Sequence, residues 1–132
     1  MDPTENFRCL NIAHASVVVA DVARALRFYC EVLGVGVDAA RPDLGYPGAW
    51  LIVGAQQIHL LQLPNCDPTA GRPAHVGRDR HVALFVNDIS ALQARLRTHD
   101  VPFTFSRSGR AALFCRDPDG NGLEFIESTP AP

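Results

Sequence analysis

Three histidines and one glutamate of this 132-residue chain could together bind a metal ion. Imidazole nitrogens and carboxylate oxygens are ligands that divalent transition metals accept. A single histidine within a strand, however, is more commonly a surface or half-buried side chain with one hydrogen bond. A metal site therefore requires the fold to bring four separate residues together: His14, His59, His81 and Glu124.

An internal repeat gives a reason for these residues to meet. The segments HASVVVADVARALRFYCEVLGV, from His14, and HVALFVNDISALQARLRTHDV, from His81, both begin with histidine and continue as an apolar strand. Each segment reaches an aspartate seven residues later, Asp21 or Asp88, and then changes to helical periodicity. Both aspartates are predicted helix N-caps. The chain is therefore predicted to contain two copies of one unit.

Each copy continues with three further strands. The first helix is expected to end at Gly34, a residue suited to a left-handed C-terminal position. Strand signals follow near residues 35–39, 49–54 and 57–63 in the first copy, and near 102–105, 111–115 and 122–128 in the second. The segment RDPDGNG before the last strand favours a tight hairpin, because its Asp-Gly and Asn-Gly pairs tolerate positive φ. Both halves thus read β-α-β-β-β.

The repeat puts the four candidate ligands at equivalent positions. The first strand of each copy begins with His14 or His81, and the last strand carries His59 or Glu124 within an apolar run. If a pseudo-twofold axis relates the copies, these strands can project all four side chains toward one concave centre. A buried, unpaired Glu124 would be costly, so it needs a cation or a donor as its partner. A metal held by the three histidines would supply that partner.

Two further histidines are interpreted differently. His75 falls in the polar, Pro- and Gly-rich stretch between the copies, and His99 falls at a helix end, so both are expected to be solvated.

Composition limits the class of protein. The chain is long enough for one good core, and we expect a single domain with module one at about 10–64, a linker at 65–79 and module two at about 80–128. The formal net charge is −2 without long runs of like charge, so no nucleic acid or anionic membrane is expected as a partner.

Targeting signals and cysteine spacing bear on the cellular location of the protein. The N-terminus lacks the basic and apolar segments of a signal peptide, and no stretch approaches the roughly 18 apolar residues of a membrane span, so a cytoplasmic location is expected. The four cysteines lie far apart without a C-x-x-C pair, which favours reduced thiols over a zinc ribbon or a disulfide framework.

The chain resembles the vicinal oxygen chelate superfamily, which includes glyoxalase I, methylmalonyl-CoA epimerase, fosfomycin resistance proteins, extradiol dioxygenases and bleomycin resistance proteins. The matching motifs are His14 with VVVADVARALRFYCEVLG, GAWLIVGAQQIHLLQLP, RHVALFVNDISALQARL and FCRDPDGNGLEF. The resemblance implies an α+β fold in which two tandem β-α-β-β-β modules form a cupped mixed sheet, usually in a homodimer. It leaves open whether one cup is built within a chain or from modules of two chains.

The resemblance also implies the chemistry. A divalent ion (Ni, Zn, Fe, Mn or Co), held by His14, His59, His81 and Glu124, would chelate neighbouring oxygens of a small oxygenated metabolite as a Lewis acid. Glu124 would be the general base. We therefore expect a glyoxalase-like enzyme, similar to lactoylglutathione lyase. Glyoxalase I enzymes typically have a carboxylate where this chain has His59, so the hemithioacetal reaction itself stays open.

Three alternatives remain. An extradiol dioxygenase with Fe(II) could use His14, His81 and Glu124, but Phe114 occupies the position of that family's tyrosine and residues 100–132 contain no histidine. Fosfomycin-type thiol transfer needs a basic pocket that the sequence does not reveal. A non-catalytic sequestering protein of the bleomycin-resistance kind would generally lack the ligand set. Three loop arginines are candidates for holding a substrate carboxylate: Arg41, Arg107 and Arg110.

Overall fold

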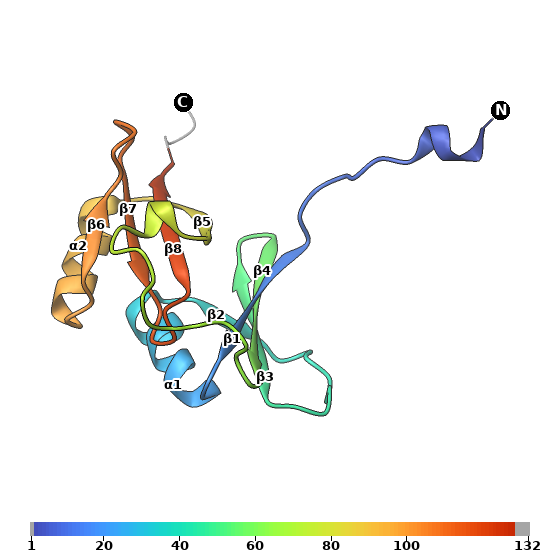
Figure 1. Ribbon diagram of the computed structural model, residues 1–132, viewed down its shortest axis with the longest axis horizontal. Helices are drawn as coiled ribbons and strands as arrows, with labels where there is room; N and C mark the ends of the chain where they lie inside the picture. Colours follow the sequence, from blue (N-terminus) through green and yellow to red (C-terminus); the bar gives the residue numbers. More distant parts are fainter. Residues whose placement is uncertain (1, 129–132) are drawn as a thin grey trace.

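The computed structural model describes residues 2–128, which form two β-rich modules preceded by an extended N-terminal segment (Figure 1). After a short 3₁₀-helix, η1 (Pro3–Asn6), the first module contains β1 (His14–Val19), α1 (Val22–Leu26), the π-helical segment η2 (Arg27–Val32), β2 (Gly36–Asp38), β3 (Gly48–Val53) and β4 (Gln56–Gln62). The second module follows the 3₁₀-helix η3 (Val76–Arg78) and contains β5 (His81–Val86), α2 (Ile89–Thr98), β6 (Phe103–Phe105), β7 (Ala112–Arg116) and β8 (Gly122–Glu127). The predicted α+β fold class is confirmed.

The two sheets have the same topology. Their strand orders are β1-β4-β3-β2 and β5-β8-β7-β6, and in each the first and last strands of the module pair in parallel while the other pairs are antiparallel. The register is also the same: Ser16 lies opposite His59 in the first sheet, and Ala83 lies opposite Glu124 in the second. The internal repeat in the sequence is therefore repeated in backbone geometry.

The helix boundaries follow the predicted caps. The Asp21 side chain accepts hydrogen bonds from the backbone N–H groups of residues 23 and 24, and Asp88 accepts one from that of Ala91. Gly34 has φ of 74° after the first helix, as its position suggested. The first helix is not regular throughout, because η2 widens to π-helical bonding where Phe28, Tyr29 and Val32 are all buried.

One face of each sheet packs into a common core. Alternate strand residues such as Leu51, Leu60, Leu113 and Phe125 pack with the apolar sides of the helices in one continuous cluster. The opposite face is more open: along β5, residues 81, 83 and 85 are exposed while the residues between them are partly buried. The candidate ligands lie on these open faces.

A hydrogen-bonded hairpin joins the modules. In the β7–β8 turn, the Asp117 carboxylate accepts bonds from the hydroxyl of Tyr29 at 2.8 Å and from the amide of Asn121 at 2.9 Å. The Asn121 amide also donates to the Val18 carbonyl oxygen, 3.0 Å away in β1. Burial raises the pKa of Asp117, and burial raises that of Tyr29 well above its usual value. Gly120 has φ of 85°, as the predicted tight hairpin requires.

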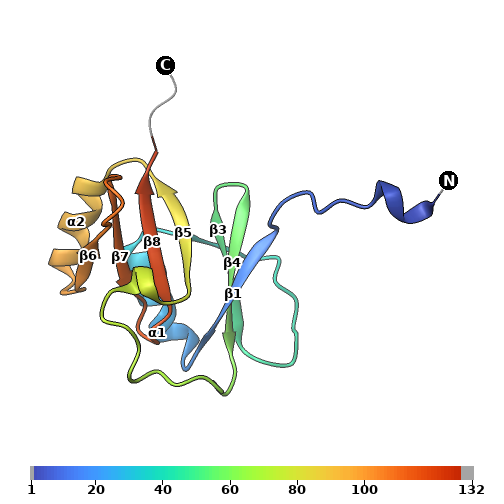
Figure 2. The ribbon, with the colours of Figure 1, turned by 45° about the horizontal axis from the view of Figure 1, so that its top comes forward.

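The two sheets lie beside each other, and the stretch between β4 and β5 crosses from one module to the other (Figure 2). All four cysteines are free thiols, and only Cys115 is buried, where burial raises its pKa to about 12. Over residues 2–128, helices are too short or too polar to span a bilayer.

Candidate metal site

In the first module, two candidate ligands form a stack with an aromatic side chain. The ring of His59 lies 3.9 Å from that of His14, with an angle of 15° between their planes. On its other side, the ring of Trp50 lies 4.8 Å from that of His59. These residues come from the adjacent strands β1, β4 and β3, so the sheet itself places them in a row.

His59 is already held by a hydrogen-bond chain. Its Nε2 atom lies 2.8 Å from Oε1 of Gln57, whose amide nitrogen donates to Asp38 Oδ2 at 2.9 Å. Burial, with the positive charges of His14 and Arg41, lowers the pKa of His59. A neutral ring is the form that binds a metal, but binding through Nε2 would require the bond to Gln57 to break.

In the second module, His81 faces Glu124 at ligand distance. Nδ1 of His81 lies 2.8 Å from the Asp79 carbonyl oxygen, which can only accept, so Nδ1 carries a proton. Nε2 of the same ring lies 3.2 Å from Glu124 Oε1. When the His81 ring is neutral, its Nε2 atom and Glu124 Oε1 are both acceptors and repel each other. A cation between these two atoms is therefore favoured. Two ligand atoms of one tetrahedral metal ion are about 3.3 Å apart, which is similar to this separation.

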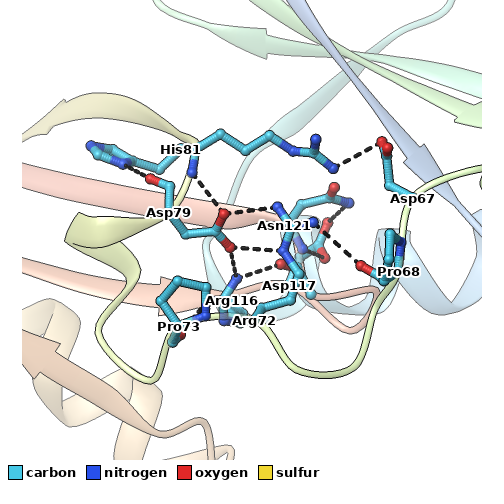
Figure 3. Close-up of polar contacts among 11 residues, drawn as sticks. Asp67, Pro68, Arg72, Pro73, Asp79, His81, Arg116, Asp117 and Asn121 are labelled. Atoms are coloured by element: carbon cyan, nitrogen blue, oxygen red, sulfur yellow. Dashed lines mark hydrogen bonds and ion pairs between the residues drawn. The ribbon is translucent and has the colours of Figure 1, made fainter.

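Asp79, whose carbonyl orients His81, is fixed by two arginines (Figure 3). Arg72 donates to both of its carboxylate oxygens, at 2.9 and 2.8 Å, and Arg116 donates to Oδ2 at 2.8 Å. The hydrogen bonds from Arg72, and then those from Arg116, hold the pKa of Asp79 well below its usual range. Because Arg116 lies in β7, these bonds hold the end of the linker against β7 immediately before His81. The orientation of the His81 ring follows from that attachment.

Glu124 has a second partner in Arg110, one of the three arginines considered as substrate contacts. The Glu124 side chain is only 6% exposed, and its Oε2 atom accepts from Arg110 Nη2 at 3.1 Å. Among residues 2–128, the other two arginines form no ion pair with Glu124: Arg41 donates to the Tyr46 carbonyl oxygen within its own loop, and Arg107 is exposed. Oε2 of the buried carboxylate is therefore paired with Arg110, whereas Oε1 faces Nε2 of His81.

The expectation that His75 is solvated is wrong. Its Nδ1 atom lies 2.9 Å from Thr104 Oγ1, and its half-buried ring meets the ring of Phe114 edge-on at 5.0 Å. Phe114 also contacts the His81 ring edge-on at 5.4 Å. The path of the linker across β6 and β7 places His75 here, and no local sequence pattern signals that path. His99 ends α2 and is exposed, as expected.

The four candidate ligands form two pairs rather than one cluster. Within residues 2–128, His, Cys, Asp and Glu side chains nowhere gather in a group of three or more that could hold a metal ion. The pairs nevertheless occupy equivalent register positions: His14 corresponds to His81, and His59, opposite Trp50, corresponds to Glu124, opposite Phe114. Three imidazoles and one carboxylate are a donor set that fits a divalent transition metal, provided that the pairs can meet.

Known proteins share this fold and sequence pattern. Residues 11–125 match the family model described as the Glyoxalase/Bleomycin resistance protein/Dioxygenase superfamily. The chain is 31% identical to the uncharacterized protein YaeR of Escherichia coli over 129 residues, covering 88% of this chain and 95% of that protein. It is 28% identical to a lactoylglutathione lyase of Haemophilus influenzae, covering 90% and 93%.

Solved structures agree with this match. The structure of a putative glyoxalase family protein from Bacillus anthracis superimposes with a TM-score of 0.77 at 25% identity, covering 94% of this chain and 99% of the other. The matched region contains the first sheet, the second sheet up to residue 125 in β8, and all four candidate ligands. The chain therefore belongs to the Glyoxalase/Bleomycin resistance protein/Dioxygenase superfamily.

Proposed function

We propose that this protein is a divalent-metal-dependent, glyoxalase-like enzyme whose metal site is completed by two copies of the chain. One copy would contribute His14 and His59, and the other would contribute His81 and Glu124. The observation that carries the proposal is the equivalent register of the two pairs on separate sheets, together with the 3.2 Å separation of His81 Nε2 and Glu124 Oε1.

A second copy is supported by the edges of the sheets. Among residues 2–128, β1 and β5 each pair with one neighbouring strand only, and each begins with a candidate histidine. On the same face of β5 as His81, Phe85 is 75% exposed, which is costly for a large aromatic side chain in water. A twofold dimer that joins these faces would bury Phe85 and bring the two pairs together.

The site would bind a small metabolite with neighbouring oxygens. A bound divalent ion would supply Lewis-acid polarisation of those oxygens. Glu124 would take a proton from the substrate carbon as general base, and burial of its side chain would keep water from competing. Trp50 and Phe114, at equivalent positions beside the two pairs, would give the site apolar walls. A hemithioacetal is the first substrate to test, because the chain is 28% identical to a lactoylglutathione lyase.

An extradiol dioxygenase is the second candidate, favoured by two observations. His59 is tied to Gln57, which would leave His14, His81 and Glu124 as a set of two histidines and one carboxylate with open positions on iron(II). In addition, His75 beside Phe114 offers an imidazole that the sequence alone did not place near the site. A non-catalytic sequestering role is the third candidate, because the family also includes bleomycin resistance proteins.

Metal titration of the purified protein tests the proposal. The wild type should bind close to one divalent ion per chain when Ni, Zn, Mn or Fe is added, whereas His14→Ala, His81→Ala and Glu124→Gln should each bind more weakly by roughly 100-fold. Binding far below one ion per chain with every metal would refute the metal site.

Two activity assays then separate the candidate reactions. Loss of hemithioacetal absorbance would support the isomerase, and oxygen uptake with catechols under iron(II) would support the dioxygenase. If both assays are negative while a bound ligand raises the melting temperature, a sequestering role gains support.

A further inference from the structure

We propose that Arg110 is a tethered cation that occupies Glu124 in the metal-free protein and competes with the metal ion for this carboxylate. This inference rests on the proposed metal site. It concerns a residue that would not itself be a ligand and that controls how tightly the ion is held.

The contact is between one buried and one exposed side chain. Arg110 Nη2 lies 3.1 Å from Glu124 Oε2, and the two side chains are 56% and 6% exposed, respectively. Glu124 is fixed within β8 between β5 and β7, whereas Arg110 lies in the loop between β6 and β7. The guanidinium can therefore move away into solvent, but the carboxylate cannot.

The loop is organised so that it presents Arg110 to the site. The Ser108 hydroxyl oxygen accepts from Arg110 Nε at 3.1 Å and from the Arg110 backbone N–H at 3.4 Å. The hydroxyl groups of Ser108 and Ser106 are in turn 2.7 Å apart. The position of the guanidinium thus follows from a short chain of hydrogen bonds, which reduces the entropy that a free arginine would lose on pairing.

The competition follows from charge. A buried carboxylate without a cation is unfavourable, so Arg110 stabilises the metal-free protein by pairing with Glu124. A divalent ion that binds Glu124 must displace the guanidinium or remain close to its positive charge, and both effects weaken metal binding. Removing Arg110 should therefore lower the stability of the metal-free protein and at the same time raise its affinity for the metal.

Removing Arg110 is expected to change stability and metal affinity in opposite directions, and this distinguishes the proposed role from a structural one. If Arg110 merely supported the fold of the site, its removal would lower stability and weaken metal binding together. Arg107 is the matched control, because it lies in the same loop and forms no ion pair with Glu124 in the described part of the chain.

The experiment compares Arg110→Met with Arg107→Met. Zinc and nickel dissociation constants are measured by competition with a chromophoric chelator, and the melting temperature of each protein is measured after the metal has been removed. We expect Arg110→Met to bind metal about five to ten times more tightly than the wild type, while its metal-free form melts at a lower temperature. Arg107→Met should match the wild type in both measurements. Arg110→Lys should fall between the two, because it keeps the charge and loses the planar fork.

The possible results distinguish failure of the competition from failure of the proposed metal site. Equal or weaker metal binding by Arg110→Met, with a functional wild-type site, would overturn the competition and leave the proposed function intact. Absence of metal binding in both the wild type and Arg110→Met would overturn both proposals. Equal tightening by Arg107→Met would also overturn the inference, because it would show a general effect of net charge instead of displacement from Glu124.

Discussion

At the residue scale, the site depends on which atoms the surrounding groups leave free. The Asp79 carbonyl takes the Nδ1 proton of His81 and leaves Nε2 toward Glu124, whereas Gln57 engages Nε2 of His59. The geometry of the His81–Glu124 pair thus suits the proposed metal ion, whereas His59 already makes a hydrogen bond. Residue types alone could not reveal this difference, because it depends on which neighbouring atom, the Asp79 carbonyl oxygen or the Gln57 amide oxygen, each ring nitrogen meets.

Asp79→Asn tests whether the pairing of Asp79 with Arg72 and Arg116 stabilises the folded protein. The pKa of Asp79 is lower in the folded protein than in the unfolded chain, where it is near 3.9. The ionised carboxylate therefore stabilises the fold fully at pH values above the unfolded pKa, and this stabilisation is lost as the pH falls through the folded pKa. We expect the variant to melt at a lower temperature than the wild type at pH 7, with a difference that shrinks below about pH 4. Thermal unfolding of both proteins between pH 3 and pH 7 checks this, and a difference independent of pH would contradict it.

A pair of variants tests whether His59 is a ligand. If it is, His59→Ala should weaken metal binding by at least roughly tenfold, while Gln57→Ala should leave binding equal or tighter because it releases Nε2. Chelator competition on both variants gives the answer. Unchanged metal affinity in His59→Ala would mean that His59 lines the site without binding the metal. That result would favour the three-ligand arrangement of the second candidate function.

At the element scale, the sequence predicted the order of strands and helices well, since the signals for them are local. The caps at Asp21 and Asp88 and the positive φ at Gly34 are set by neighbouring residues, and the structure contains all three. The π-helical turn and the course of the linker were not predicted, because they depend on packing between distant segments. His75 was misjudged for the same reason: its partners Thr104 and Phe114 are far along the chain.

Gly122→Ala tests how closely the linker must approach β8. A Cβ atom at this position would lie 2.7 Å from the Arg80 carbonyl oxygen and 2.7 Å from Val76, so η3 and the start of β5 would have to move. We expect a loss of about 1–3 kcal/mol in unfolding free energy together with weaker metal binding. Gly36→Ala is the control, because its φ is not positive and a Cβ there would have no atom of residues 2–128 within 4 Å apart from those of its two chain neighbours. Urea unfolding of both variants checks the contrast, and equal stability would contradict it.

At the scale of the whole molecule, the two modules carry half of the candidate site each. The repeat in the sequence correctly indicated which residues are equivalent, and the common register of the two sheets shows it in the backbone. The sequence could not indicate whether equivalent residues meet within one chain. That depends on how the modules are joined, and here the β7–β8 hairpin ties Asp117 to Tyr29 and Asn121 to Val18 while the ligand pairs stay apart.

The shared site can be measured directly with a mixed dimer. His14→Ala and Glu124→Gln, carrying different affinity tags, are co-expressed and the mixed dimer is isolated. If each site combines the first module of one copy with the second module of the other, one site of the dimer receives both substitutions and the other receives neither. The control is a mixed dimer of His81→Ala and Glu124→Gln, in which both sites are damaged.

We expect the first mixed dimer to bind about one divalent ion with wild-type affinity, while both parent variants and the control dimer bind none tightly. A mixed dimer that binds metal as weakly as its parents would contradict the shared site, and so would a wild-type protein that binds metal as a monomer.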